Sequence, residues 1–274
     1  MKLTVDDIKF NIILNETDLN TNKTPVVFLH GFTGCAKDWL FLFDKIPLNF
    51  YPIAIDLIGH GETGTTDNLD YYSGNRIVHH LDSIFSKLNL GKIIIAGYSM
   101  GGRAALSYSI QHSQRIIYAI FESSTPGIED FLLKKQRVEF DFLLADKIKE
   151  IGIESFIDLW FDTPLFEPLK KLPNFESIRK ERYQNNPAGL ANMLEGFSTG
   201  IMTDYWGKLH LLDFPVLLIT GDLDEKFTNI NRKMLNRIPK AKHQTVISCG
   251  HNVHLEKPEV FIKLVNDFLN NSIE

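Results

Sequence analysis

The chain is poor in cysteine and contains no long apolar run. Its 274 residues include only two cysteines, Cys35 and Cys249, which argues against a disulfide-stapled fold, and we expect both to be small buried side chains. No segment reaches the roughly 18 consecutive apolar residues that a membrane span needs. The sequence from Met1 to Asp7 lacks the apolar stretch of a secretory signal. We therefore expect a cytoplasmic protein without a membrane span.

An excess of positive charge is also missing. The net charge is -5, which gives no reason to expect nucleic acid or an anionic membrane as a partner. No group of His, Cys and Asp residues has metal-ligand spacing, and the glycines form neither a Walker loop nor a dinucleotide fingerprint. The sequence implies no cofactor and no metal, and the expected partner is a small molecule.

What the chain does contain is an ordinary globular composition, with 44% hydrophobic and 23% charged residues. Helical patterns at 71–88 and 102–112 alternate with short β-branched or aromatic runs. Several runs are almost continuously apolar, which is typical of central strands in a parallel sheet covered on both faces. The predicted strands are 8–14, 25–29, 51–55, 92–96, 116–121, 215–220 and 244–248.

The alternation of strand and helix stops after residue 126. From 127 to 206 the pattern is helical and rich in charge, and the alternation resumes at Pro215 and ends in a terminal helix at 258–269. We therefore predict an α/β core formed by residues 1–126 and 207–274, interrupted by a helical cap of residues 127–206.

The most specific motif is Gly97-Tyr98-Ser99-Met100-Gly101, a G-x-S-x-G pattern between a predicted strand and a predicted helix. This context is typical of a nucleophile elbow, in which a strained turn exposes the serine hydroxyl at the sheet edge. The glycines leave room for the backbone to cross. Ser99 is the candidate catalytic serine.

A nucleophilic serine needs a base. His251 follows the last predicted strand in Cys249-Gly250-His251, where a loop at the sheet edge can place the imidazole over Ser99. His254 is the alternative, although its position favours the start of the terminal helix.

The base in turn needs an acid. Asp224 lies beyond the end of a predicted strand and is preferred to Asp222, which is well placed to cap the turn, and to Glu122, which follows another strand. The order Ser99, Asp224, His251 is that expected of an α/β-hydrolase triad.

An oxyanion hole requires two backbone N–H groups that point toward the reacting oxygen. We expect these from Met100, directly after the serine, and from Phe32 in the loop His30-Gly31-Phe32-Thr33-Gly34.

Together these motifs resemble the α/β-hydrolase superfamily. A finer resemblance, from about residue 25 to 268, is to 2-succinyl-6-hydroxy-2,4-cyclohexadiene-1-carboxylate synthases of menaquinone biosynthesis. It implies a mostly parallel central sheet flanked by helices, with a helical cap inserted after the sixth strand. The finer resemblance is carried by 97–103, 122–127 and 223–227.

The resemblance implies a lyase that eliminates pyruvate from a tricarboxylate, with Ser99 acting as a base. Arginines suit carboxylates because a guanidinium binds them with two hydrogen bonds. Arg103 lies one turn into the helix after the serine, Arg137 occupies the place of the family's substrate arginine, and Arg182 is a further candidate. For the two cap arginines a solvated helix face is the alternative. Tyr98 and Trp160 are expected to wall the pocket, although plain packing serves equally for Trp160.

Two other functions stay open at this stage. A carboxylesterase or carbon–carbon bond hydrolase would use the same serine, histidine and aspartate, and a small-molecule receptor could keep the scaffold without catalysis. The sequence leaves the oligomeric state open, with a monomer as the expectation.

Overall fold

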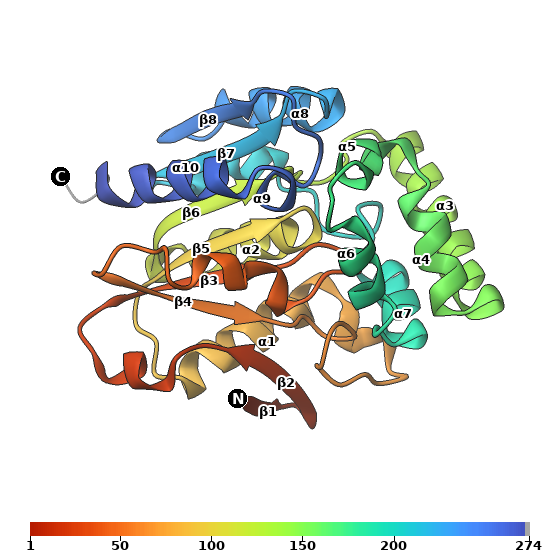
Figure 1. Cartoon of the computed structure of the whole chain (residues 1–274), viewed down its shortest axis with the longest axis horizontal. Helices are drawn as coiled ribbons and strands as arrows, with labels where there is room; N and C mark the ends of the chain where they lie inside the picture. The colour runs from red at the N-terminus through yellow and green to blue at the C-terminus, as the bar shows by residue number, and fades with distance from the viewer. Residues whose placement is uncertain (272–274) are drawn as a thin grey trace.

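A central eight-stranded sheet organises the computed structural model, which describes residues 1–271 (Figure 1). The strand order is β1-β2-β4-β3-β5-β6-β7-β8. The first two strands are antiparallel to their neighbours, whereas β3 to β8 run parallel. The α/β-hydrolase fold class is therefore confirmed. The strands are β1 (Lys2–Val5), β2 (Ile8–Ile13), β3 (Thr24–Leu29), β4 (Phe50–Ile55), β5 (Ile93–Tyr98), β6 (Ile116–Glu122), β7 (Val216–Gly221) and β8 (Ala241–Val246).

The central strands are apolar because both faces of the sheet are covered. In β5, Ile93 and Ile95 pack on one face and Ile94 and Ala96 on the other, as expected for side chains that alternate along a strand. Helices α1 (Gly74–Lys87), α2 (Met100–Gln111) and α8 (Glu225–Leu235) contribute to the first core. The second core receives α10 (Pro258–Asn271) and the 3₁₀ helix η2 (Ala36–Leu42).

The strands at the two ends of the sheet differ most from the prediction. The strand β1 was missed because its half-exposed, polar sequence carries little periodicity. The last strand, β8, begins and ends earlier than predicted, because its exposed edge is polar and the apolar Ile247 lies beyond it at 78% exposure. With β1 included, β6 is the sixth strand, and the helical insertion follows it as expected.

Five α-helices and two 3₁₀ helices lie between β6 and β7, and the α-helices stand over the carboxyl ends of the strands (Figure 1). They have a small core of their own, with Phe156, Phe161 and Leu190 fully or almost fully buried. We call this segment the cap; its exact division from the core remains a prediction. The cap helices are α3 (Phe131–Ile151), α4 (Ile153–Phe161), α5 (Glu167–Lys170), α6 (Phe175–Arg182) and α7 (Pro187–Phe197).

Several short helices complete the described chain. The α-helix α9 (Val253–Glu256) precedes α10. The remaining 3₁₀ helices are η1 (Glu16–Asn20), η3 (Leu69–Tyr72), η4 (Ser113–Arg115), η5 (Pro164–Phe166) and η6 (Trp206–Leu211).

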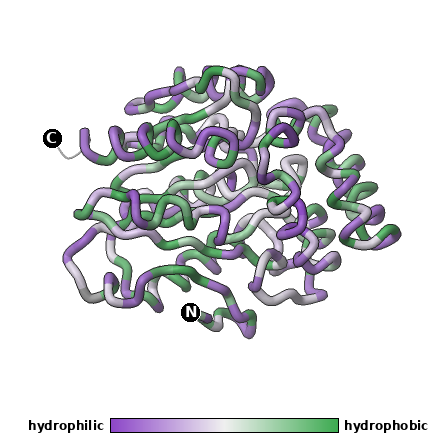
Figure 2. Tube along the Cα trace, viewed as in Figure 1, coloured by the Kyte–Doolittle hydropathy of each residue, from purple (hydrophilic) through white to green (hydrophobic). Residues whose placement is uncertain are grey.

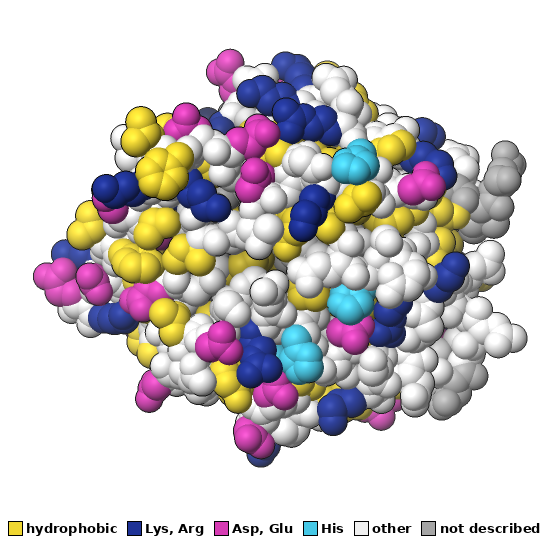
Figure 3. All heavy atoms as spheres, turned by 180° about the vertical axis from the view of Figure 1, so that it is seen from behind, with side chains coloured by type: hydrophobic (Ala, Val, Ile, Leu, Met, Phe, Trp, Pro, Cys, Tyr) yellow, Lys and Arg dark blue, Asp and Glu magenta, His cyan; other side chains and the backbone are white. Residues whose placement is uncertain are grey.

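Apolar side chains are buried in the sheet but also exposed on the cap. Hydrophobic stretches of the chain trace occur in the middle of the molecule and along the cap helices (Figure 2), and the central strands β5 and β7 are completely buried. From behind, hydrophobic side chains also gather on the side of the cap (Figure 3), where Phe131 and Leu143 of α3 are 76% and 71% exposed. No helix within residues 1–271 combines the length and apolarity that crossing a membrane requires.

Candidate active site

Ser99 sits in a strained turn between β5 and α2. Its backbone angles are φ 50° and ψ −106°, a conformation that a residue with a side chain rarely adopts. A Cβ atom on Gly97 would lie 2.3 Å from the Gly101 carbonyl oxygen, and one on Gly101 would lie 2.2 Å from that of Leu29. Only glycine fits at these two positions, so the G-x-S-x-G pattern follows from the close backbone crossing.

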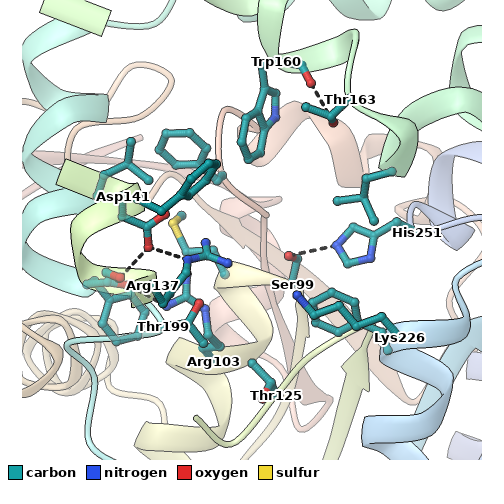
Figure 4. A pocket seen from close by; sticks show the side chains of 18 of the residues that line it. Ser99, Arg103, Thr125, Arg137, Asp141, Trp160, Thr163, Thr199, Lys226 and His251 are labelled. Atoms are coloured by element: carbon teal, nitrogen blue, oxygen red, sulfur yellow. Dashed lines mark hydrogen bonds and ion pairs between the residues drawn. The ribbon is translucent and has the colours of Figure 1, made fainter. Parts of the chain in front are cut away.

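The hydroxyl of Ser99 contacts His251, and His251 contacts Asp224. The His251 Nδ1 atom lies 2.6 Å from Asp224 Oδ2, and Nε2 lies 3.1 Å from Ser99 Oγ (Figure 4). An ionised carboxylate can only accept, so Nδ1 donates to Asp224 and Nε2 is left to accept the serine proton. Both His251 and Asp224 are buried. The three residues preferred from the sequence therefore lie in one hydrogen-bonded row.

The alternative acid and base lie elsewhere. His254 Nδ1 donates to the Glu122 carboxylate at 2.9 Å, in a buried position away from Ser99 Oγ. Asp222 accepts a hydrogen bond from the Cys249 N–H at 3.2 Å and so fixes the turn, as expected.

A cavity of about 310 Å³ opens above Ser99, between the strand ends and the cap. This volume suits a small-molecule ligand. Ser99 and His251 line it together with Phe32, Tyr98 and Met100 from the core. Its cap side is largely apolar and includes Phe140, Trp160, Leu165, Phe166, Leu194 and Phe197.

Three cationic side chains line the same cavity. Arg103 donates to the Phe197 carbonyl at 2.5 Å and lies over the Phe197 ring. Burial and the neighbouring Arg137 lower the pKa of Arg103 to about 9, which leaves it charged at neutral pH. Arg137 Nε donates to Asp141 Oδ2 at 2.6 Å. The third cation is Lys226, and burial, followed by the charge of Arg137, lowers its pKa.

Lys226 was missed by the sequence analysis, although it lies two residues after Asp224. It is the second residue of α8, and Figure 4 shows it beside Ser99 in the cavity. The signal was its place in Leu223-Asp224-Glu225-Lys226-Phe227, a run quoted above only for its resemblance. A lysine in the first turn of a helix is disfavoured by the helix dipole, which could have marked it as unusual.

The two amides expected to form an oxyanion hole are near the serine. Met100 is the first residue of α2, so its N–H has no acceptor within the helix. Phe32 precedes Thr33, whose φ is 67°, in a turn closed by the hydrogen bond from Gly34 N to the Gly31 carbonyl at 3.0 Å. Within residues 1–271 neither amide donates a hydrogen bond to a protein acceptor.

Arg182 does not line the cavity that holds Ser99, contrary to the prediction. Its guanidinium donates to Asp38 at 2.8 Å and is almost completely buried at the junction of cap and core. Arg182 thus binds the carboxylate of Asp38, where the prediction expected a carboxylate of the substrate. Arg182 is therefore left out of the proposed substrate site.

Tyr98 and Trp160 do lie on the cavity wall. The Trp160 ring meets the Phe32 ring edge-on at 5.3 Å between centroids and stacks with Phe156. Its Nε1 atom is buried without an acceptor among the described residues. The Tyr98 ring packs against His251 with centroids 5.2 Å apart.

Comparisons with known proteins agree with this geometry. A family model described as the alpha/beta hydrolase fold matches residues 24–258. A Bacillus subtilis (strain 168) protein, provisionally named 2-succinyl-6-hydroxy-2,4-cyclohexadiene-1-carboxylate synthase, is 41% identical over 246 residues, which is 89% of each chain. This chain belongs to that synthase family. An Enterobacter sp. (strain 638) protein with the same synthase name is 29% identical over 85% of this chain and 86% of its own.

Solved structures place the synthase family within a wider fold. The structure of MenH from S. aureus superposes with a TM-score of 0.89 at 33% identity, covering 97% of this chain and 99% of the other. A thermophilic esterase from Thermogutta terrifontis superposes with a TM-score of 0.86 at 20% identity, covering 99% and 98%. The second likeness concerns the fold alone. The residues around the cavity, rather than the fold, must therefore separate a synthase from an esterase.

Proposed function

We propose that this chain eliminates pyruvate from 2-succinyl-5-enolpyruvyl-6-hydroxy-3-cyclohexene-1-carboxylate, as a lyase of menaquinone biosynthesis. The observation that carries the proposal is the cavity itself, which has a hydrogen-bonded serine and histidine on one side and three cations around it. Membership of the synthase family supports the same reaction.

The reaction needs a base for a carbon acid. In the proposed mechanism Ser99 gives its proton to His251 and removes the proton from the ring carbon next to the succinyl ketone. The C–H electrons form a new double bond, the existing double bond shifts by one position, and the C–O bond to the enolpyruvyl group breaks. The departing enolate takes up the proton that His251 received from Ser99 and becomes pyruvate, while Ser99 regains its hydroxyl proton from the ring carbon, so atoms and charges balance.

Asp224 and the two backbone amides would serve the same step. Asp224 holds His251 in the tautomer that accepts the Ser99 proton and stabilises the imidazolium that forms. The N–H groups of Phe32 and Met100 would donate to the ketone oxygen as it gains enolate charge. Loss of one such donor typically costs about 3 kcal/mol of the barrier.

The cations would bind the carboxylates of the substrate. Arg103 and Arg137 can each offer a guanidinium fork, and Lys226 adds a point charge on the side of Ser99. Tyr98 and Trp160 would wall the cyclohexene ring, and the unpartnered Trp160 Nε1 is a further donor to a polar substrate atom.

The test is a coupled assay for pyruvate release from freshly generated substrate, corrected for spontaneous elimination. Wild-type protein should release pyruvate rapidly, Ser99→Ala should fall to near background, and Ser86→Ala, on an exposed helix position, should match the wild type. A wild-type rate equal to the background would reject the synthase and favour the carboxylesterase or carbon–carbon hydrolase, to be tested with ester and diketone substrates.

A further inference from the structure

The loop that carries His251 has no regular secondary structure. It connects the end of β8 at Val246 to the four-residue helix α9, and no helix or strand ladder holds its backbone. The contact of 3.1 Å between His251 and Ser99 nevertheless depends on where this backbone lies. Other hydrogen bonds must therefore fix the loop.

The carboxylate of Glu256 provides two of them, one on each side of His251. The Gly250 N–H donates to Glu256 Oε2 at 2.5 Å, and the Asn252 N–H donates to Oε1 at 3.1 Å. The last residue of α9 thus reaches back and joins the N–H groups of the two residues on either side of the histidine. A Cβ on Gly250 would lie 2.9 Å from Oε1, so glycine leaves the space that the carboxylate occupies.

Glu256 is buried without a cationic partner in the described chain. It is 8% exposed and forms no ion pair with any lysine, arginine or histidine of residues 1–271. An isolated buried carboxylate is strongly unfavourable unless N–H groups solvate it. Charge-assisted hydrogen bonds of this kind are shorter and stronger than neutral ones. A glutamine could accept at only one of the two positions.

The neighbouring segments hold the loop at both ends. On one side Leu223 N donates to the Cys249 carbonyl at 2.9 Å, which ties the loop to the turn that presents Asp224. On the other side His254 N donates to Glu122 Oε1 at 3.0 Å. Glu256 supplies the bonds in the middle, next to the histidine itself.

We infer that Glu256 is a positioning residue for His251, holding its backbone so that the imidazole meets both Asp224 and Ser99. The inference rests on the proposed role of His251 as the base. Glu256 lies outside the substrate cavity and would act only through the loop.

The experiment compares Glu256→Gln with Glu259→Gln, a matched change at an exposed carboxylate on α10. Three readouts are kcat and KM for pyruvate release, the rate at which a fluorophosphonate probe labels Ser99, and the low-field NMR resonance of the His251 Nδ1 proton. For Glu256→Gln we expect kcat and the labelling rate to fall roughly 10- to 100-fold with KM within about twofold. The proton resonance should shift or broaden, and Glu259→Gln should match the wild type.

Each other outcome decides the question. Unchanged kcat, labelling and resonance in folded Glu256→Gln would overturn the inference. Should that variant not fold, the same readouts are taken on Glu256→Asp, which keeps the charge but is too short to bridge both amides. A folded Glu256→Asp should lose kcat and labelling rate in the same way, and unchanged values would overturn the inference. If Glu256→Asp also fails to fold, Glu256 is a folding residue and the inference is wrong. Slower labelling of Glu256→Gln, in a protein whose wild type releases no pyruvate, would support the positioning role and reject only the proposed reaction.

Discussion

Glu122 and His254 form a hydrogen-bonded acid–histidine pair beneath the active site, with His254 Nδ1 2.9 Å from the carboxylate. Both side chains are about 1% exposed. The His254 ring stacks on Trp39 with centroids 4.5 Å apart and packs against Tyr98. The pair therefore lies one layer below the row of Ser99 and His251, where it supports the structure and does not reach the cavity.

His254→Ala should destabilise the protein, because it removes the imidazole from the buried Glu122 carboxylate and leaves the backbone N–H of residue 254 as the remaining donor from this residue. Removing one member of a buried pair typically costs about 3 to 5 kcal/mol, which urea denaturation would measure. Adding Glu122→Gln to His254→Ala should recover part of that loss, since the orphaned charge disappears. Strictly additive losses would show that the two side chains are not coupled.

Arg103→Ala should reduce kcat/KM for the tricarboxylate by roughly 10- to 100-fold, the value of one hydrogen-bonded charge. Hydrolysis of a small neutral ester, if the protein has any, should stay nearly unchanged. Arg232→Ala, at an exposed position on α8, is the control. An equal loss on both substrates would contradict the assignment of Arg103 to a substrate carboxylate.

The side chains that the sequence analysis expected to lie together do so where backbone geometry dictates the residue type. Gly97 and Gly101 mark the elbow because no Cβ fits there, and the strand ends that carry Asp224 and His251 follow from the alternation of strands and helices. The carboxyl ends of neighbouring parallel strands share one sheet edge, so these side chains had to lie close together.

The sequence analysis misjudged Arg182 and omitted Lys226, because the surroundings of each charge are formed by residues distant in sequence. Arg182 looked available for a substrate because Asp38, its partner, lies 144 positions away. Lys226 was given no role because the sequence does not show that α8 begins at the cavity. Tertiary contacts decide which partner Arg182 has and where the Lys226 side chain lies. Hydrophobic periodicity and motif spacing do not show such contacts.

The KM for the tricarboxylate should rise at alkaline pH, because burial and Arg137 lower the pKa of Lys226 below the usual lysine value of 10.5. A lowered pKa means that the ammonium loses its proton, and its attraction for a carboxylate, at a lower pH than an exposed lysine would. Lys226→Arg should flatten part of this rise, because at the same position a guanidinium keeps its proton to a higher pH than an ammonium. Arg103 is common to both proteins, so the difference between their pH profiles isolates Lys226. Identical profiles would exclude Lys226 from binding.

The ion pair of Arg182 and Asp38 should stabilise the fold. Variants of the two residues can therefore distinguish a structural arginine from one that binds substrate. Both side chains are largely buried, and Asp38 also accepts from the Cys35 N–H at 3.1 Å, next to the loop that carries Phe32. Arg182→Met and Asp38→Asn should therefore each lower the free energy of unfolding by about 3 kcal/mol. The double variant should lose less than the sum, because the pair acts as a unit.

An arginine that binds substrate would behave differently. Arg182→Met would then raise KM many-fold while Asp38→Asn left it unchanged, and the two stabilities would differ little from the wild type. Urea denaturation together with KM for the three variants distinguishes these cases. We expect the stability effects to dominate, because the guanidinium already has its carboxylate within the fold.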